Sequence, residues 1–354
     1  MPAPSSFNGM WRAFREIDVG SMREDAQITP RLAVIGPRER TSLLEATLQQ
    51  GPRTTNQLVT AVRAYRMPLS AADLNALAGY DLRIALLENP AQVTDDDVQA
   101  LIAQPGPLVL VIEQLGKSSV VASPHESTGA ASVTMIAASL DDPKAVQKTL
   151  LPAIAKALPD SDVALGRAYP GLRPTVVQEM IQRTSMTNSV YAAGTGLAEM
   201  VPGLGIPFAV ADIIILTKNQ LVMAYKIGLV MGETGEFRDV LPKMAGVVGA
   251  GFMWRQVARE LVAFLPLGVV LKVAIAYAGT YATGEAIYHW YATGEKLDRE
   301  QFRALFNDAL VRGKEEAVAL VARMRREEKT ALAEPQPARR RRIALPRRRA
   351  VEGM

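Results

Sequence analysis

The periodicity of apolar residues changes at the Pro- and Gly-rich segment 168–174, which divides this 354-residue chain into two parts. Before it, short apolar runs alternate with helix-type stretches, a pattern typical of βαβ units and a parallel sheet. After it, helical periodicity continues to about residue 326 without a convincing strand. A chain of this length accommodates two hydrophobic cores. We therefore predict an α/β domain over residues 30–170, followed by an all-α domain over residues 175–330.

Four apolar runs in the first part predict strands, and LVLVIE at Leu108–Glu113 is almost continuously apolar, as a buried parallel strand would be. The expected strands are 31–36, 81–88, 108–113 and 132–136, and the expected helices of this part are 41–50, 94–104 and 143–158. Thr94, with Asp97 three residues later, predicts the N-terminal cap of the second of these helices.

Long helices are expected throughout the second part. They cover about 175–200, 207–231, 238–264, 267–293 and 298–328. Pro207 suits the first turn of one of them, and Asp298 with Gln301 forms a capping pattern at the start of the last. Upstream of the α/β domain, residues 1–29 space Trp11, Phe14 and Ile17 along one side of a helix, which predicts an N-terminal arm packed on the body.

Two stretches of the helical part are strongly apolar. Residues 201–216 contain a single charge, Asp212, and residues 261–284 contain a single charge, Lys272. About twenty apolar residues suffice to span a bilayer, so the second stretch fits a membrane helix, although a helix buried in a compact bundle would look the same. An isolated charge in apolar surroundings needs a partner, and we expect Asp212 and Lys272 to form a structural ion pair rather than a transport site.

Small residues recur every four positions in the second apolar stretch, at Ala276, Thr280 and Gly284. This spacing allows close helix approach, either in lipid or in a tight soluble bundle. Together with Pro207, Asp212 and Lys272, these residues form our predicted membrane or oligomer contact.

Composition limits the chemistry and locates the charge. The absence of cysteine excludes thiolate metal sites and thiol catalysis, and two histidines make a histidine-rich metal site unexpected. The last twenty residues, 335–354, hold seven arginines and one acid. The positive charge of this segment exceeds the net charge of the whole chain, +4, so the remaining chain is slightly acidic. This tail has no apolar period, and we predict that it is disordered and binds anionic lipid, nucleic acid or an acidic protein. Its arginines are Arg339, Arg340, Arg341, Arg342, Arg347, Arg348 and Arg349.

The helical part resembles the GTPase-associated helical domain of unknown function found in YcjF-like bacterial inner-membrane proteins. The resemblance covers residues 175–320 and is carried by MVPGLGIPFAVAD at Met200–Asp212, KNQLVMAYKIG at Lys218–Gly228, LPLG at Leu265–Gly268 and AGTYATGEAIYHW at Ala278–Trp290. In that family the domain often follows a small GTPase-like domain. The resemblance therefore implies that the α/β part is a P-loop GTPase-like domain and that the second part is a Gly-rich apolar helical bundle.

The α/β part lacks a complete phosphate-binding loop. Such a loop reads GxxxxGK[ST], because backbone amides and a lysine cradle the phosphates while a hydroxyl holds Mg²⁺. After the first strand, Gly36, Thr41 and Ser42 match the two ends of this pattern. The second glycine and the lysine are missing, and Pro37 removes an amide donor. We interpret these residues as a vestigial nucleotide site.

The other GTPase motifs are degenerate as well. Arg66–Leu69 stands where D-x-x-G is expected, and Glu113–Gly116 stands where the guanine-reading N-K-x-D is expected. Gly116–Ser118 spells GKS, but the residue that should be the first glycine of a phosphate loop is Val111, inside a strand. Lys117 nevertheless lies at the carboxyl edge of the sheet, where α/β folds bind ligands, so it is the best-placed cation for an anion.

These observations predict a non-enzymatic pseudo-GTPase that acts as a scaffold or adaptor and requires no cofactor. We expect it on the cytoplasmic side of the inner membrane, integral or associated through its helical domain, with lipid and a protein partner or a second copy as partners. One alternative is an active NTPase that binds GTP and Mg²⁺ through an unconventional loop. Another is a soluble self-assembling structural protein whose tail binds nucleic acid.

Overall fold

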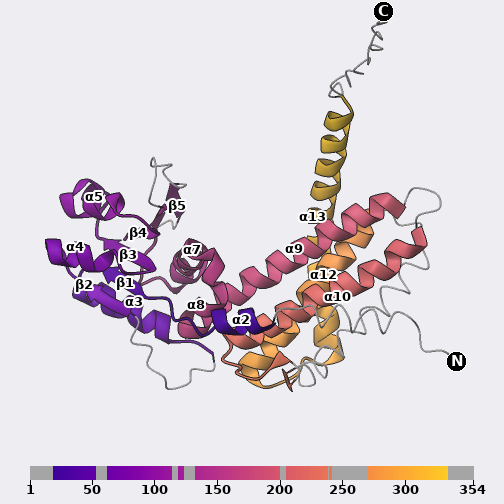
Figure 1. Ribbon diagram of the computed structural model, residues 1–354, viewed down its shortest axis with the longest axis horizontal. Helices are drawn as coiled ribbons and strands as arrows, with labels where there is room; N and C mark the ends of the chain where they lie inside the picture. The colour runs from indigo at the N-terminus through magenta and orange to yellow at the C-terminus, as the bar shows by residue number, and fades with distance from the viewer. Residues whose placement is uncertain are drawn as a thin grey trace, which may run out of the picture.

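The computed structural model describes residues 19–52, 62–113, 119–122, 132–199, 205–237, 239–240 and 269–333. A sheet with its helices lies at one end of the molecule, and a bundle of long helices lies at the other (Figure 1). The expected combination of a parallel sheet with a helical region is confirmed.

The sheet has six strands in the order β2-β1-β3-β4-β6-β5, and only the edge strand β5 is antiparallel to its neighbour. The strands are β1 (Leu32–Ile35), β2 (Val62–Tyr65), β3 (Leu82–Leu87), β4 (Leu108–Ile112), β5 (Ser119–Ala122) and β6 (Val133–Ala137). The chain passes from β2 to β3 across β1, so the strand order reverses beside β1. In α/β sheets, ligands bind at the carboxyl ends of the strands at such a reversal.

The four predicted strands are confirmed as β1, β3, β4 and β6. Every residue of β1, β3 and β4 is buried, which explains why β1 and β4 are continuously apolar and why Arg83 is the only polar residue of β3. The strands β2 and β5 were not predicted. β2 lies at the sheet edge with Arg63 and Ala64 exposed, so it lacks the apolar run that buried strands show.

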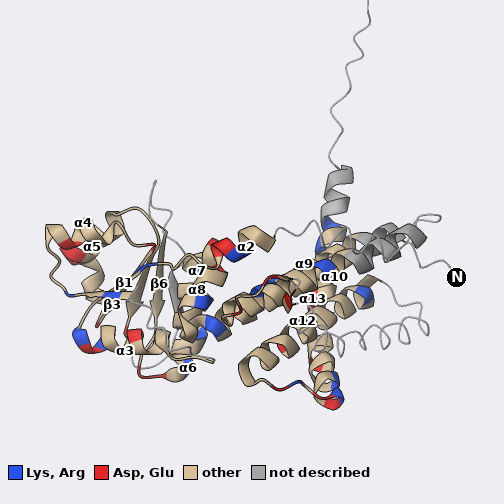
Figure 2. Cartoon of the chain, turned by 60° about the horizontal axis from the view of Figure 1, so that its bottom comes forward, with Lys and Arg blue, Asp and Glu red and all other residues tan. Residues whose placement is uncertain are grey.

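Helices cover both faces of the sheet (Figures 1 and 2). Along β3, Ile84 and Leu86 join the core that contains α3, while Ala85 and Leu87 join the core that contains α4 and α5. This alternation follows from the two-residue period of a strand. The helices here are α3 (Arg38–Gln49), α4 (Ala71–Leu77), α5 (Asp96–Ala103), α6 (Pro143–Ala145), the π-turn η2 (Val146–Leu150), α7 (Leu151–Ala157) and α8 (Asp162–Ala168).

The predicted cap at Thr94 is wrong. Residues Pro90–Thr94 form a separate 3₁₀ helix, and Asp95 precedes α5. The Thr94 hydroxyl donates to the carbonyl of Ala91 (2.8 Å), whereas Asp97 accepts from the amide of Leu69 (3.1 Å). The Ser/Thr–Asp spacing occurs here without a cap because both side chains have other partners.

The helical part contains α9 (Arg173–Glu199), α10 (Gly205–Val230), α12 (Val269–Thr293) and α13 (Arg299–Ala333), which confirm four of the predicted helices. The capping pattern before α13 is confirmed, because the Gln301 amide donates to Asp298 (2.8 Å) and the Asp298 amide donates to Gln301 (2.9 Å). The fifth predicted helix, 238–264, falls almost entirely outside the described residues. So do Trp11, Phe14 and Ile17, although the short helix α2 (Val19–Asp25) packs Met22 on the core.

The two parts share a continuous apolar core that runs from one face of the sheet through α7 and α8 into α9, α10, α12 and α13. Buried polar groups reinforce this junction. The hydroxyl of Tyr169 donates to the carbonyl of Pro30 (2.5 Å), and the guanidinium of Arg167 donates to the carbonyls of Leu229 and Glu233 (2.9 and 2.8 Å). Arg173, which is 2% exposed, donates to the carbonyl of Pro52.

Helix α12 is the centre of the bundle and contacts α9, α10 and α13. Most of its residues are buried, which accounts for its apolar sequence. Among the helices of the described ranges, none combines the length and hydropathy needed to cross a bilayer. Residues 261–268, the first third of the predicted span, lie outside those ranges.

Candidate functional site: the carboxyl edge of the sheet

Three charged side chains meet at the carboxyl edge of the sheet. Arg40 comes from the first turn of α3, Glu113 directly follows β4, and Asp141 follows β6. The Nε atom of Arg40 lies 3.2 Å from Oε2 of Glu113, and its Nη1 atom lies 2.8 Å from Oδ2 of Asp141. The Glu113 side chain is 13% exposed and that of Asp141 is 60% exposed, so one carboxylate is mostly buried and the other faces solvent.

Arg40 directly precedes Thr41. If Thr41 corresponds to the Ser/Thr of a phosphate-binding loop, Arg40 stands at the position of the lysine. In such a loop, that cation faces the phosphates. Here the same position carries a cation whose partners are two carboxylates of the chain itself. The protein's own anions therefore satisfy the charge that a bound phosphate would satisfy.

Gly36 does not supply a free amide for an anion. Its amide donates to the carbonyl of Tyr65 in β2 (3.0 Å). Its φ is +150°, and an added Cβ would lie 3.0 Å from the carbonyl oxygen of Leu86 and 3.1 Å from its Cβ. Glycine is thus required for the close approach of the β1 and β3 ends.

Thr41 and Ser42 are not arranged as ligands of a metal ion. Thr41 is 3% exposed, its hydroxyl donates to the carbonyl of Arg38 (2.9 Å), and its amide donates to the carbonyl of Pro37 (3.0 Å). Both groups serve the first turn of α3, which begins only two residues after Gly36. Ser42 is exposed on the same helix. The predicted residues are therefore neighbours in space, but they do not form a phosphate cradle.

The protonation of Glu113 is perturbed by its surroundings. Burial raises the pKa of its carboxyl group, Asp141 and Glu88 raise it further, and Arg40 opposes them. The pKa of Arg40 is raised, chiefly by its hydrogen bond to Asp141. The Oε1 atom of Glu113 is buried and has no hydrogen-bond partner among the described residues. In the sequence, Glu113 is recognisable only as part of a degenerate guanine motif, and its ion pair is not predicted. The arginine at the lysine position of the phosphate loop is the sequence signal that points to such an ion pair.

A second polar cluster lies inside the helical bundle, where Thr280 connects three helices. Its hydroxyl accepts from Asn188 Nδ2 of α9 (2.8 Å) and Gln220 Nε2 of α10 (3.2 Å), and it donates to the carbonyl of Ala276 (2.8 Å). Asn188 Oδ1 accepts in turn from Asn219 Nδ2 (2.7 Å). Thr280 and Asn188 are fully buried, so this network fixes the register of α9, α10 and α12.

Three residues of the predicted membrane or oligomer contact, Ala276, Thr280 and Gly284, are packed inside the bundle. Thr280 is 0% exposed and Ala276 is 4% exposed. A Cβ at Gly284 would lie 2.6 Å from Cγ1 of Ile181 in α9. The small residues therefore serve a close helix contact within one chain and do not face lipid or a second copy.

For the other three residues of the predicted membrane or oligomer contact, the described part of the structure gives no contact that joins them. Pro207 and Asp212 lie in α10, and Lys272 lies in α12. The side chains of Pro207 and Asp212 are outside the described part, so the expected Asp212–Lys272 pair stays a prediction. Lys117 and the seven tail arginines also lie outside it.

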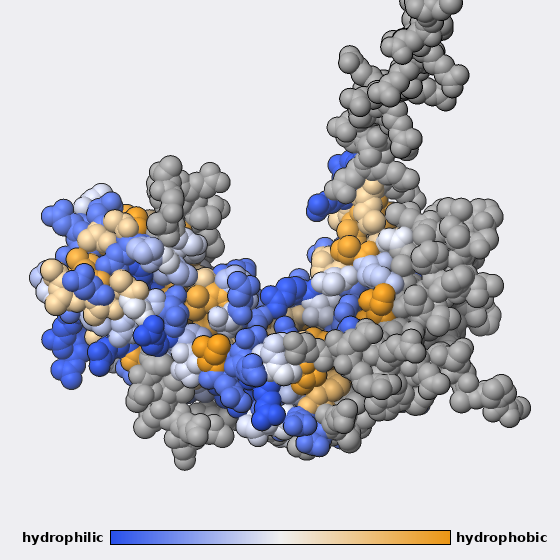
Figure 3. All heavy atoms as spheres, in the orientation of Figure 1, coloured by the Kyte–Doolittle hydropathy of each residue, from blue (hydrophilic) through white to orange (hydrophobic). Residues whose placement is uncertain are grey.

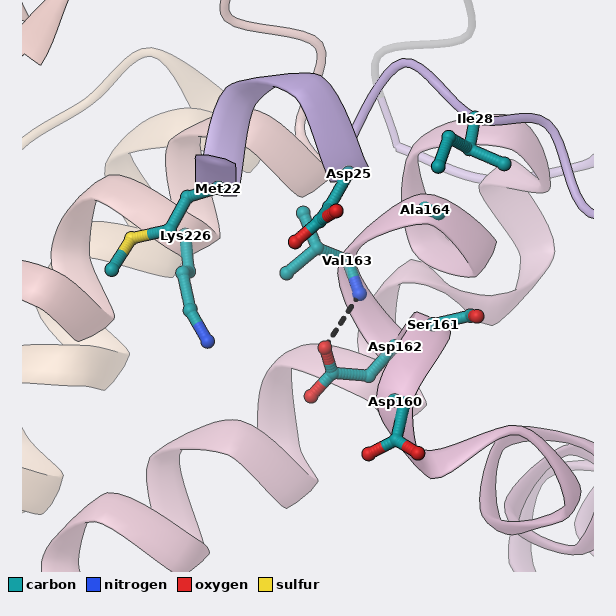
Figure 4. A pocket seen from close by; sticks show the side chains of 9 residues that line it. All are labelled: Met22, Asp25, Ile28, Asp160, Ser161, Asp162, Val163, Ala164 and Lys226. Atoms are coloured by element: carbon teal, nitrogen blue, oxygen red, sulfur yellow. Dashed lines mark hydrogen bonds between the residues drawn. The ribbon is translucent and has the colours of Figure 1, made fainter. Parts of the chain in front are cut away.

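Among the cavities lined by described residues, two lie away from the sheet edge. The smaller, of about 330 Å³, opens between α2, α8 and α10 and is lined by Asp25, Asp160, Asp162 and Lys226 among others (Figure 4). Asp162 accepts from the amide of Val163 (2.7 Å) and also binds Arg183, so its carboxylate is already engaged. The larger, of about 770 Å³, lies between the end of α3, the α6–α7 segment and the start of α9.

Comparison with protein-family models, curated proteins and solved structures gave no significant match for this chain.

Proposed function

We propose that this protein is a non-enzymatic scaffold or adaptor, built on a GTPase-like sheet whose nucleotide site has been replaced by internal ion pairs. One observation carries the proposal: Arg40, at the place of the phosphate-loop lysine, binds Glu113 and Asp141. A nucleotide phosphate at this edge would have to displace two carboxylates, one of them mostly buried. It would also meet no free amide at Gly36. The resemblance of residues 175–320 to the YcjF-like helical domain is consistent with this proposal.

We further propose that the protein attaches to anionic membrane surfaces through its arginine-rich tail. The small residues of α12 are used inside the bundle, so they do not supply a lipid-facing surface. The tail retains seven arginines over twenty residues. Each arginine near an anionic surface contributes roughly 1 kcal/mol of attraction, which falls with ionic strength.

Equilibrium binding of fluorescent GTP and ATP with Mg²⁺ tests the loss of the nucleotide site. We expect no saturable binding to the full chain at nucleotide concentrations up to about 1 mM, where even a −4 kcal/mol interaction would be seen. A Glu113→Gln, Asp141→Asn double variant tests whether the carboxylates block a nucleotide site that is otherwise present. Binding of nucleotide by the variant indicates a blocked site, and no binding indicates that the site is absent. Tight, Mg²⁺-dependent binding by the unaltered chain would contradict the proposal and favour the NTPase alternative.

Co-sedimentation with vesicles tests the attachment. We expect the full chain to bind vesicles that contain an anionic lipid and not to bind neutral vesicles. Binding to the anionic vesicles should weaken as the salt concentration rises. A matched variant with all seven tail arginines replaced by glutamine keeps the chain length and should stay in the supernatant. Binding to duplex DNA but not to anionic vesicles would instead support the nucleic-acid alternative.

A further inference from the structure

Helix α13 has one face packed on the bundle and an opposite face that is exposed. The inward face lies against α12, and at Gly313 the two helices approach so closely that an added Cβ would lie 2.9 Å from the carbonyl oxygen of Ala274. The buried residues on this face follow helical spacing and are Phe302, Phe306, Ala309, Gly313, Ala317 and Val321. The helix continues beyond the bundle, where it projects from the molecule (Figure 1).

The exposed face carries an apolar line. Val311 and Val318 are 60% and 58% exposed, although most other large apolar side chains of the described residues are covered. Seven residues advance an α-helix by nearly two full turns, so both valines lie on the same side. Ala304 and Ala322 are exposed and lie within about 20° of Val311 around the helix. Figure 3 shows apolar side chains on the projecting part of α13.

Charges of opposite sign border this line. At 100° per residue, Glu315 lies about 40° to one side of Val311 and Lys314 about 60° to the other. Both side chains are exposed. If two copies of α13 pair in parallel through the valines, the Glu315 side of each helix faces the Lys314 side of the other, at the same height. An antiparallel pair with Val311 opposite Val318 would instead bring the Glu315 sides of the two helices together, so that Glu315 faces its own equivalent.

We propose that this face of α13 binds the α13 of a second copy of the chain, in parallel and in register. The β-branched valines at seven-residue spacing suit the seam of a parallel two-stranded pair. The exposed alanines permit close approach, and the Lys314–Glu315 pairs set the orientation. Parallel pairing also brings both arginine-rich tails to the same end of the dimer. The line is short compared with the interfaces of stable complexes, so we expect dissociation in the micromolar range.

Sedimentation equilibrium of the full chain tests the dimer. We expect a monomer–dimer equilibrium whose dissociation constant rises about 100-fold in a Val311→Ser, Val318→Ser variant, because four valine side chains lose their apolar contact. Both positions are exposed, so the fold should be unaffected, and circular dichroism checks this. Val190→Ser is the matched control, because Val190 is 45% exposed on α9 and outside the line. A chain that is monomeric up to about 100 µM, or a Val190→Ser effect equal to that of the α13 variant, overturns the proposal.

The natural absence of cysteine allows the orientation to be tested directly. A Val311→Cys variant should form an interchain disulfide with itself under mild oxidation, whereas Ala72→Cys, exposed on α4, should not. An antiparallel pair that keeps both valines in the contact places Val311 opposite Val318, so it would crosslink when Val311→Cys and Val318→Cys chains are mixed and not within Val311→Cys alone, and that outcome contradicts the proposed geometry. Lys314→Glu should weaken dimerisation about tenfold, and the double exchange Lys314→Glu, Glu315→Lys should restore it. Failure of the double exchange to restore dimerisation excludes the proposed charge pairing.

Discussion

Arg40 and Glu113 form an ion pair in which Nε of Arg40 lies 3.2 Å from Oε2 of Glu113. Arg40 lies in the first turn of α3 and Glu113 follows β4, so the two residues are far apart in the sequence. The pair lies where an α/β sheet ordinarily presents cations to a ligand. Glu113 is mostly buried, so its charge depends on Arg40 for stabilisation, and Arg40 is correspondingly unavailable to an external anion. The same ion pair therefore stabilises the buried carboxylate and occupies the cation at this edge.

Replacing Arg40 by Met should destabilise the protein by about 1–3 kcal/mol, because it leaves a mostly buried carboxylate without its cation. Urea unfolding followed by circular dichroism measures this change. Arg31→Met is the matched control: Arg31 pairs with Asp81 at 3.8 Å, and both side chains are about half exposed or more. The control should lose less than about 1 kcal/mol. Equal losses in the two variants would show that the Arg40 pairs are no stronger than an ordinary surface pair.

The raised pKa of Glu113 predicts a pH dependence of stability. The folded state binds the Glu113 proton more tightly than the unfolded state does, so this group favours folding at low pH. Its contribution is lost as the pH rises above the unfolded glutamate value, about 4.3, and through the raised folded pKa. A Glu113→Gln variant removes this titration. The difference in unfolding free energy between the unaltered chain and the variant should change in favour of the variant as pH rises from about 4 to 7; a constant difference would contradict the prediction.

Gly284→Ala should destabilise the helical bundle, because the new Cβ would lie 2.6 Å from Cγ1 of the fully buried Ile181. Overpacking of this kind costs about 1–3 kcal/mol. Gly194→Ala on α9 is the control, since an added Cβ there meets nothing within 4 Å. That variant should gain about 0.5–1 kcal/mol from the better helix propensity of alanine. Thermal unfolding should therefore shift in opposite directions for the two variants.

Thr280→Val should cost about 1–3 kcal/mol, because the amide donors of Asn188 and Gln220 lose their shared acceptor inside the bundle. Thr187→Val is the control: the Thr187 hydroxyl makes the same kind of bond to the carbonyl four residues earlier, but the side chain is exposed. Chemical denaturation of both variants gives the comparison. Similar, small losses would indicate that water satisfies the two amides in the variant.

The buried strands and long helices were predictable because each depends on a local pattern. β4 is continuously apolar since both faces of the sheet are covered, and α13 begins at a capping pair only three residues apart in sequence. The edge strand β2 carries no such pattern, because exposure of Arg63 removes the need for apolar residues. It is recognised as a strand only by its hydrogen-bonded pairing with β1.

The sequence by itself determined where the chain changes from a sheet to long helices, and it showed that the phosphate-binding motif is incomplete. Only the tertiary structure decided which charges meet at the carboxyl edge, because Arg40 and Asp141 are separated by 101 positions and come into contact only when α3 and the segment after β6 lie at the same edge of the sheet. The same holds for Ala276, Thr280 and Gly284. Their spacing indicates close helix contact, but which helix they contact depends on the packing of α12 against α9 within the chain.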